Sequence, residues 1–126
     1  MAHCDVDLLF KEKGGGLLEL GLKNNMDKTY EIRYDRLPWV LAGGGVDFNV
    51  LIDGEKVRKG VGAGQNNVIL RIGAKSSVSS DVDINYLRSF YRNVPIDRVK
   101  IFWTYDLPSE MVSGKCRHFE GVIAAP

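Results

Sequence analysis

Two histidines and two cysteines are the side chains of this chain best suited to hold a metal ion. His3 and Cys4 lie near the N-terminus, whereas Cys116 and His118 lie near the C-terminus. Imidazole nitrogens and thiolate sulfurs are the ligands of tetrahedral zinc sites, so the four could converge if the first and last strands met. A disulfide or ordinary packing explains the same residues more simply. We therefore expect no metal site.

The cysteines leave two interpretations open. Cys4 precedes the first expected strand and Cys116 precedes the last, too far apart in sequence for a CxxC redox motif. A disulfide between them would close almost the whole chain, which the chain-entropy model values at up to about 4–5 kcal/mol. Two unpaired thiols are the alternative.

The motifs that could support catalysis are incomplete. The stretch from Gly60 to Gly64 has three alternating glycines, but Gln65 stands where a dinucleotide fingerprint needs its third glycine, and no helix follows. Asp81 and Asp83 share the outward face of one expected strand, about 7 Å apart, with nothing nearby in sequence to raise either pKa. No nucleophile–base pair stands out. We expect a chain that is not an enzyme and binds no cofactor.

A proline and a tryptophan mark the best candidate contact segment. Leu37, Pro38 and Trp39 open a glycine-rich connection that ends at Gly45. An exposed Trp39 would anchor a binding partner, whereas a buried one would plug one end of the fold, and we favour the plug. Leu37, Pro38 and Trp39 remain the candidate binding residues, with Pro108–Lys115 as a second candidate loop.

The elements that carry these residues alternate between apolar and polar positions. Val78–Ile84 alternates with a period of two, Asn85–Tyr91 crosses over, and Val99–Tyr105 resumes the alternation. This pattern is typical of a sheet that folds over an edge onto a second sheet. Trp103 should lie in the core between them.

The remaining expected strands are short and separated by turn residues. Asp53-Gly54 favours a two-residue type I′ turn, and counting outward from it pairs Val50 with Val57. We expect one domain, residues 1–126, that forms an all-β, antiparallel β-sandwich of about seven to eight strands. The other strands are expected at Asp5–Lys11, Leu17–Lys23, Thr29–Tyr34, Val46–Ile52, Glu55–Val61, Asn67–Ile72 and His118–Ala124.

Composition excludes two classes of partner. The chain has 126 residues, with 17 basic and 16 acidic side chains, so the basic surface of a nucleic-acid-binding protein is missing. No apolar run approaches the roughly 20 residues of a membrane helix. The N-terminus has neither the basic start nor the apolar stretch of a signal peptide. The compartment is left open, because a leader could have been removed.

Several segments resemble a known family. They are the Asn24-Asn25 strand end, the Leu37-Pro38 loop, Val46–Val57 and Ile72–Ile84. The resemblance covers roughly residues 17–105 and is to the immunoglobulin-like domain that precedes the catalytic domain of deuterolysin-type and peptidyl-lysine metallopeptidases. More loosely, the chain is similar to intracellular proteinase-inhibitor domains of β-sandwich type. Gly73, Ser77, Val78, Asp83 and Ile84 match the most specific segment, whereas the family's serine is replaced by Asn85.

This resemblance implies an immunoglobulin-like, non-enzymatic module that binds a protein partner. The zinc-binding catalytic half is missing, so the module would be a stand-alone accessory or inhibitory domain whose partner could be a peptidase. The contacts would come from the loops named above or from an exposed edge strand. The chain itself is expected to be a monomer or an edge-strand dimer.

Two other functions stay open. A carbohydrate- or small-ligand-binding sandwich would use an aromatic platform, for which Tyr86, Phe90, Tyr91 and Phe102 are the candidates. A structural assembly subunit would instead form a stable higher oligomer.

Overall fold

The computed structural model describes residues 4–58, 68–108 and 116–126, and nearly all of its regular structure is β-strand. In the described residues no helix is long and apolar enough to span a bilayer. Three short 3₁₀-helices are η1 (Tyr34–Arg36), η2 (Asn85–Phe90) and η3 (Ile96–Arg98). The strands are β1 (Val6–Gly14), β2 (Leu17–Asn24), β3 (Tyr30–Arg33), β4 (Asp47–Ile52), β5 (Glu55–Arg58), β6 (Ile69–Ile72), β7 (Ser77–Asp83), β8 (Val99–Asp106) and β9 (His118–Ala124).

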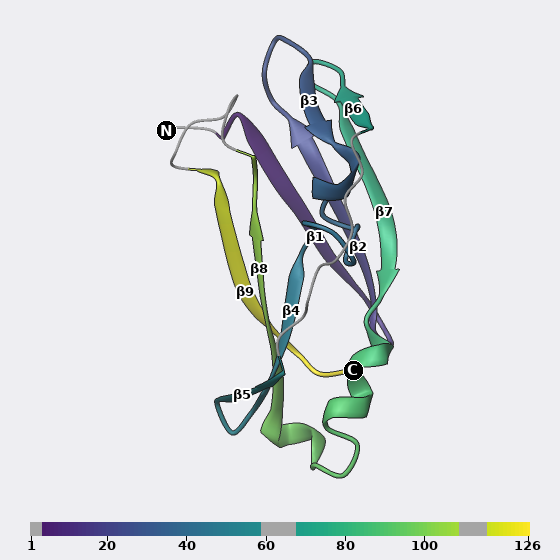
Figure 1. The fold of residues 1–126 in the computed structure, drawn as a ribbon, viewed down its shortest axis with the longest axis vertical. Helices are drawn as coiled ribbons and strands as arrows, with labels where there is room; N and C mark the ends of the chain where they lie inside the picture. Colours follow the sequence, from purple (N-terminus) through teal and green to yellow (C-terminus); the bar gives the residue numbers. More distant parts are fainter. Residues whose placement is uncertain (1–3, 59–67, 109–115) are drawn as a thin grey trace.

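The strands form three antiparallel sheets, which confirms the predicted all-β fold (Figure 1). One sheet has the order β1-β2-β7, a second pairs β3 with β6, and the third has the order β5-β4-β8-β9. The described residues contain nine strands, one at each of the nine expected ranges, although the sandwich was expected to have about seven to eight.

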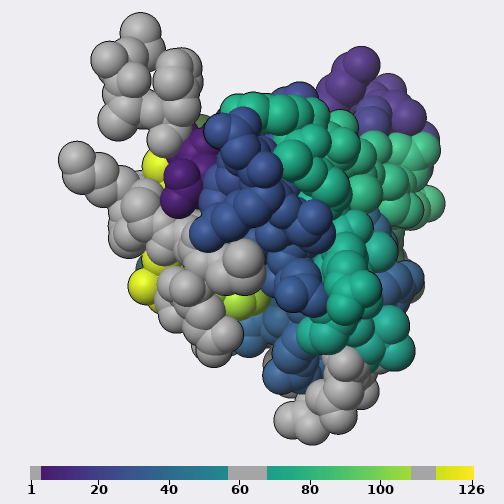
Figure 2. All heavy atoms as spheres, turned by 90° about the horizontal axis from the view of Figure 1, so that it is seen from above, coloured from purple at the N-terminus to yellow at the C-terminus, as the bar shows by residue number. Residues whose placement is uncertain are grey.

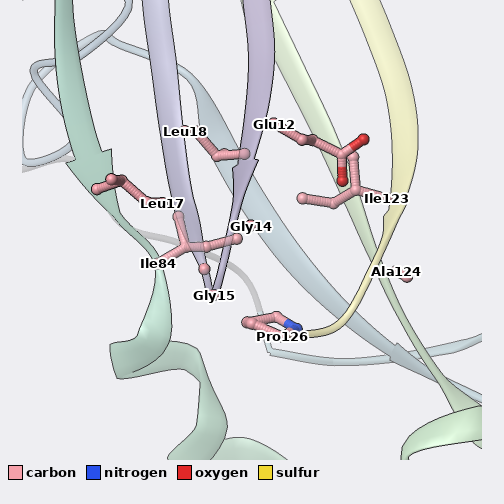
Figure 3. A pocket seen from close by; sticks show the side chains of 10 residues that line it. Glu12, Gly14, Gly15, Leu17, Leu18, Ile84, Ile123, Ala124 and Pro126 are labelled. Carbon is pink, nitrogen blue, oxygen red and sulfur yellow. The ribbon is translucent and has the colours of Figure 1, made fainter.

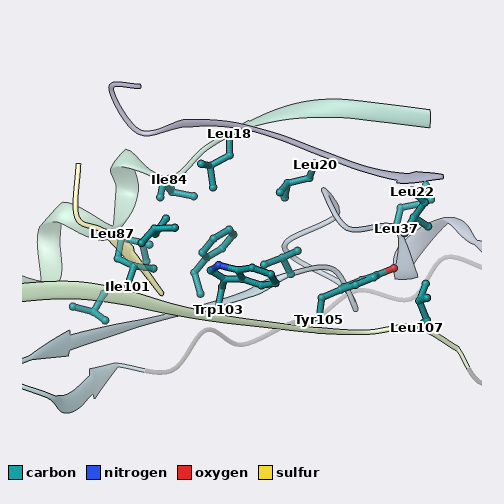
Figure 4. Close-up of a cluster of buried hydrophobic side chains, with 14 of the residues drawn as sticks. Leu18, Leu20, Leu22, Leu37, Ile84, Leu87, Ile101, Trp103, Tyr105 and Leu107 are labelled. Atoms are coloured by element: carbon teal, nitrogen blue, oxygen red, sulfur yellow. The ribbon is translucent and has the colours of Figure 1, made fainter. Parts of the chain in front are cut away.

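The predicted alternation is confirmed in the core (Figure 4). Leu18 and Leu20 of β2 are buried opposite Trp103 and Tyr105 of β8. The rings of Phe10 on β1 and Trp103 stack with their centroids 4.3 Å apart. The β1-β2-β7 sheet and the four-stranded sheet therefore pack face to face, with β1 lying over β8.

The β4–β5 hairpin has the predicted turn but not the predicted register. Asp53 and Gly54 have φ of 52° and 84°, as a type I′ turn requires. Val50 faces Arg58 rather than Val57, so the predicted Val50–Val57 pair is wrong. A β-bulge after Val50 inserts one extra residue into β5, and counting outward from a turn cannot detect such an insertion.

Strand ends differ from their predicted positions. The first strand runs on to Gly14, three residues beyond the expected end. The third strand stops at Arg33, because Tyr34 begins η1 and is 40% exposed instead of joining the apolar face. Short polar–apolar alternation continues past the point at which the chain turns, so such ends are poorly marked in sequence.

The two cysteines are joined by a disulfide whose Cα atoms lie 5.5 Å apart. Figure 2 shows part of the C-terminal segment in yellow beside the dark purple start of the described chain. The first and last strands are not paired, because β1 pairs with β2 and β9 pairs with β8. The disulfide therefore links two different sheets where β1 and β9 begin.

Candidate functional site

The segment from Leu37 to Gly45 is packed into the protein. Leu37 is fully buried, Pro38 is buried, and Trp39 is half-buried against the core. The loop is closed by its own main chain, since Val46 N donates to Pro38 O at 2.9 Å. A Cβ on Gly45 would come within 2.6–2.7 Å of three carbonyl oxygens of this loop, so no other residue fits there. This packing matches the plug interpretation of Trp39.

Two buried tyrosines near Arg36, the residue before this loop, differ in their hydrogen bonds. Tyr105 Oη donates to Arg36 O at 2.6 Å, whereas Tyr30 Oη has no partner in the described part of the chain. Burial raises the pKa of Tyr30 to about 12, and it also raises the pKa of Tyr105. Both hydroxyls stay protonated near neutral pH, so neither can act as a base there.

Three of the four residues that could have bound zinc form other bonds in the structure. The disulfide leaves neither Cys4 nor Cys116 as a thiolate ligand, and His3 lies outside the described residues. His118 Nδ1 lies 2.7 Å from Asp106 Oδ1, and this hydrogen bond raises the pKa of His118. Within residues 4–58, 68–108 and 116–126, no three His, Cys, Asp or Glu side chains form a group suited to a metal.

The paired carboxylates of β7 are each engaged. Lys13 Nζ donates to Asp81 Oδ1 at 3.1 Å, and the main-chain N–H of Asn85 donates to Asp83 Oδ1 at 2.8 Å. The hydrogen bond to Asp81 also raises the pKa of Lys13. One carboxylate forms an ion pair between strands, and the other accepts a hydrogen bond at the start of η2.

The candidate aromatic platform is divided between surface and core. Tyr86 is exposed, whereas Tyr91 is buried and its hydroxyl donates to Pro126 O at 3.2 Å. Phe90 packs against the core and Phe102 is half-buried on β8. The four rings do not form one exposed face.

Two of the concave regions at the surface are lined by described residues. A cavity of about 110 Å³ lies between the β1–β2 turn and the end of β9, where Leu18, Ile84 and Ile123 supply apolar walls (Figure 3). A depression of about 310 Å³ beside the β4–β5 turn contains the ion pair between Arg98 and Asp53. Both are partly open to solvent.

Strand β9 offers a free edge. All seven residues from His118 to Ala124 pair in regular register with β8, and no described strand pairs with the opposite edge. Next to Gly121 at the centre of β9, Val122 is 54% exposed. The segment has no proline and no lysine, which are two of the residue types that commonly protect a sheet edge.

The direction of the main-chain groups in β9 follows from the bonds at both sides of β8. Leu107 N donates to Arg117 O at 2.8 Å, and on the β4 side Asp53 N donates to Arg98 O at 2.9 Å. Hydrogen-bonded and non-hydrogen-bonded pairs alternate along an antiparallel ladder. Both bonds give the same alternation, so Phe119, Gly121 and Ile123 face β8. The main-chain N–H and C=O groups of His118, Glu120, Val122 and Ala124 point to the free edge.

Two other strand edges in the described structure, those of β1 and β5, are blunted, whereas β7 is a second regular edge of seven residues. The β1 ladder is interrupted by a bulge after Glu12, and Lys11 and Lys13 are exposed on that strand. Strand β5 has four residues and a bulge in its pairing with β4. Short strands, bulges and lysines are recognised defences against edge-to-edge pairing. Strand β9 is the longer and more regular edge of its sheet.

Sequence reasoning located β9 but did not single it out as a site. The alternation in His118–Ala124 indicated a strand, and an exposed edge was expected to be a possible contact. Which strand lies at an edge depends on sheet order, which periodicity does not reveal.

Comparison with family models, with curated proteins and with solved structures finds no match to this chain. The resemblance to the non-catalytic domain of metallopeptidases therefore stays a prediction.

Proposed function

We propose that this chain is a non-catalytic protein-binding module that adds an extended segment of its partner to the free edge of β9. The observation that carries the proposal is the row of outward-facing main-chain groups at His118, Glu120, Val122 and Ala124. Strand addition uses such groups for affinity and alternate side chains for selectivity.

The side chains of β9 favour a segment with apolar residues on one face. Phe119 and Ile123 face the core, and Ile123 also lines the cavity in Figure 3. An added strand would place its core-facing side chains beside them. Selectivity would then come from apolar side chains at alternate positions of the partner.

The nature of the partner follows from the resemblance rather than from the site. An immunoglobulin-like accessory or inhibitory domain implies a peptidase, and an extended peptidase loop has the main-chain geometry that a free strand edge recruits. We include this partner class in the proposal.

The test is recovery of partners from an extract of the source organism with immobilised protein. Val122→Pro removes one outward N–H and leaves the β8 ladder intact, because proline is tolerated where the N–H faces away from the sheet. The control variant is Ile96→Ala in η3, at a position that is also 54% exposed. Trp39→Ala tests the loop.

The expected result is a partner retained by wild type, Ile96→Ala and Trp39→Ala and lost with Val122→Pro. Circular dichroism must show that each variant is folded. A partner lost with Trp39→Ala and kept by Val122→Pro would reject the edge in favour of the loop. Identification of the retained protein by mass spectrometry tests the peptidase assignment separately.

A further inference from the structure

We infer that the β9 edge binds the β9 edge of a second copy of this chain, in antiparallel register about Gly121. The inference rests on the proposed function and names the partner segment that the sequence of β9 fits best. The two four-stranded sheets would join into one continuous sheet across a two-fold axis.

The register follows from which groups point outward. Centring the pair on Gly121 places Glu120 opposite Val122 and His118 opposite Ala124 of the second copy. All four residues direct their main-chain groups to the free edge, so each of these pairs can exchange two hydrogen bonds. The register uses all seven residues of β9.

The side chains agree with the same register. Phe119 of one copy lies opposite Ile123 of the other on the core-facing side, which pairs an aromatic with a β-branched side chain. On the outer face each Glu120 carboxylate lies opposite a valine rather than opposite its own copy. No like charges face each other.

The neighbouring registers are worse. A shift that centres the pair on Glu120 puts the two Glu120 carboxylates directly opposite each other, which is destabilising. A shift that centres it on Val122 pairs fewer residues within β9. A shift by one residue would place the outward main-chain groups of one copy opposite residues of the other copy whose main-chain groups already bond to β8.

The other sheet leaves room for this contact. Phe10 stacks on Trp103, so the middle of β1 lies over β8. The cavity beside Ile123 opens between the β1–β2 turn and the end of β9, where the Phe119 ring of the second copy would lie (Figure 3). One strand pair is a small interface, so the expected Kd is on the order of 10–100 µM.

The experiment is sedimentation of the oxidised protein over concentrations up to about 1 mM. Val122→Glu would place glutamate opposite Glu120 twice in the dimer, and we expect association at least about tenfold weaker. Val122→Lys would instead place lysine opposite Glu120 twice, so its association should equal or exceed that of wild type.

A charge exchange sharpens the test. The double variant Glu120→Lys with Val122→Glu restores opposite charges across the axis and should recover association to within about threefold of wild type. Val122→Pro should weaken association at least about tenfold, because each copy loses a main-chain donor. Ile96→Glu, at an equally exposed position outside β9, should leave it unchanged.

Wild type that stays monomeric at the highest concentration would overturn the inference. So would association that survives Val122→Glu or Val122→Pro. If β9-dependent capture of another protein persists while the chain is monomeric, the inference fails and the proposed function stands. If Val122→Pro changes neither self-association nor capture, both fail.

Discussion

The Leu37–Gly45 loop and strand β9 use their main chains in opposite ways. The loop bonds to itself, with Gly45 N donating to Val40 O and Val46 N donating to Pro38 O. Strand β9 satisfies one side through β8 and directs the other side outward. The loop holds a fully buried Leu37, whereas β9 holds an exposed Val122.

This difference separates stability from binding. A segment whose main chain and side chains are already satisfied has little to offer a partner, even when it contains proline and tryptophan. A regular strand with unpaired main-chain groups can be satisfied further by association. Changes in the loop should therefore alter folding, and changes at the outward positions of β9 should alter binding.

Removing the disulfide should have the largest effect, because it ties the start of β9 to the other sheet. The bond joins residues 112 apart in sequence. We expect the Cys4→Ser, Cys116→Ser double variant to lose about 4 kcal/mol of unfolding free energy, measured by denaturant titration. A loss of unfolding free energy below about 1 kcal/mol would show that the disulfide contributes little to holding β9 in position.

Leu37→Ala should separate the two regions most clearly. The side chain is fully buried, so its truncation should cost about 3 kcal/mol of unfolding free energy. Val122→Ala, the matched control on β9, should change stability by less than about 0.5 kcal/mol. Denaturant titration measures both. Self-association of folded Leu37→Ala should equal that of wild type, and its loss would contradict the separation.

The two buried tyrosines near Arg36 should respond differently to loss of the hydroxyl. Tyr105→Phe removes the hydrogen bond to Arg36 O and should destabilise the protein by about 1 kcal/mol. Tyr30→Phe removes a buried hydroxyl without a described partner and should be neutral or stabilising by about 1 kcal/mol. Equal losses in thermal or denaturant unfolding would show that Tyr30 also has a partner.

The smallest expected effect lies at the start of β9. The hydrogen bond from His118 to Asp106 raises the pKa of the imidazole above its ordinary value. The His118–Asp106 pair therefore contributes its full stabilisation of the fold below the unfolded pKa of about 6.5. This contribution is lost as pH rises through the folded pKa of His118. Between pH 5.5 and 8.5, wild type should lose slightly more stability than His118→Gln. Parallel pH profiles of the two proteins would mean that the His118–Asp106 pair adds nothing to stability.

Period-two alternation predicted the main strands because each buries one face. Leu18, Leu20 and Leu22 of β2, and Trp103 of β8, lie in the core as the pattern indicates. The Asp53-Gly54 turn was predictable because its dihedral angles require those residue types. These features depend on local chemistry alone.

Features that depend on contacts between distant segments were not predictable. Asn24 is a polar residue at an expected strand end, yet it is fully buried and its Nδ2 donates to Lys28 O, Ile72 O and Gly73 O. The bulge that displaces Val57 and the position of β9 at an edge likewise depend on sheet order. The candidate site was missed for this reason.

Amide hydrogen exchange along β9, measured by NMR on dilute monomeric protein, tests the central claim most directly. The amides of Phe119, Gly121 and Ile123 should exchange slowly because they face β8, whereas those of Glu120 and Val122 should exchange fast. At high concentration the Glu120 and Val122 amides should become protected. Slow exchange of all five amides in the monomer would show that the edge is already covered and would contradict the account.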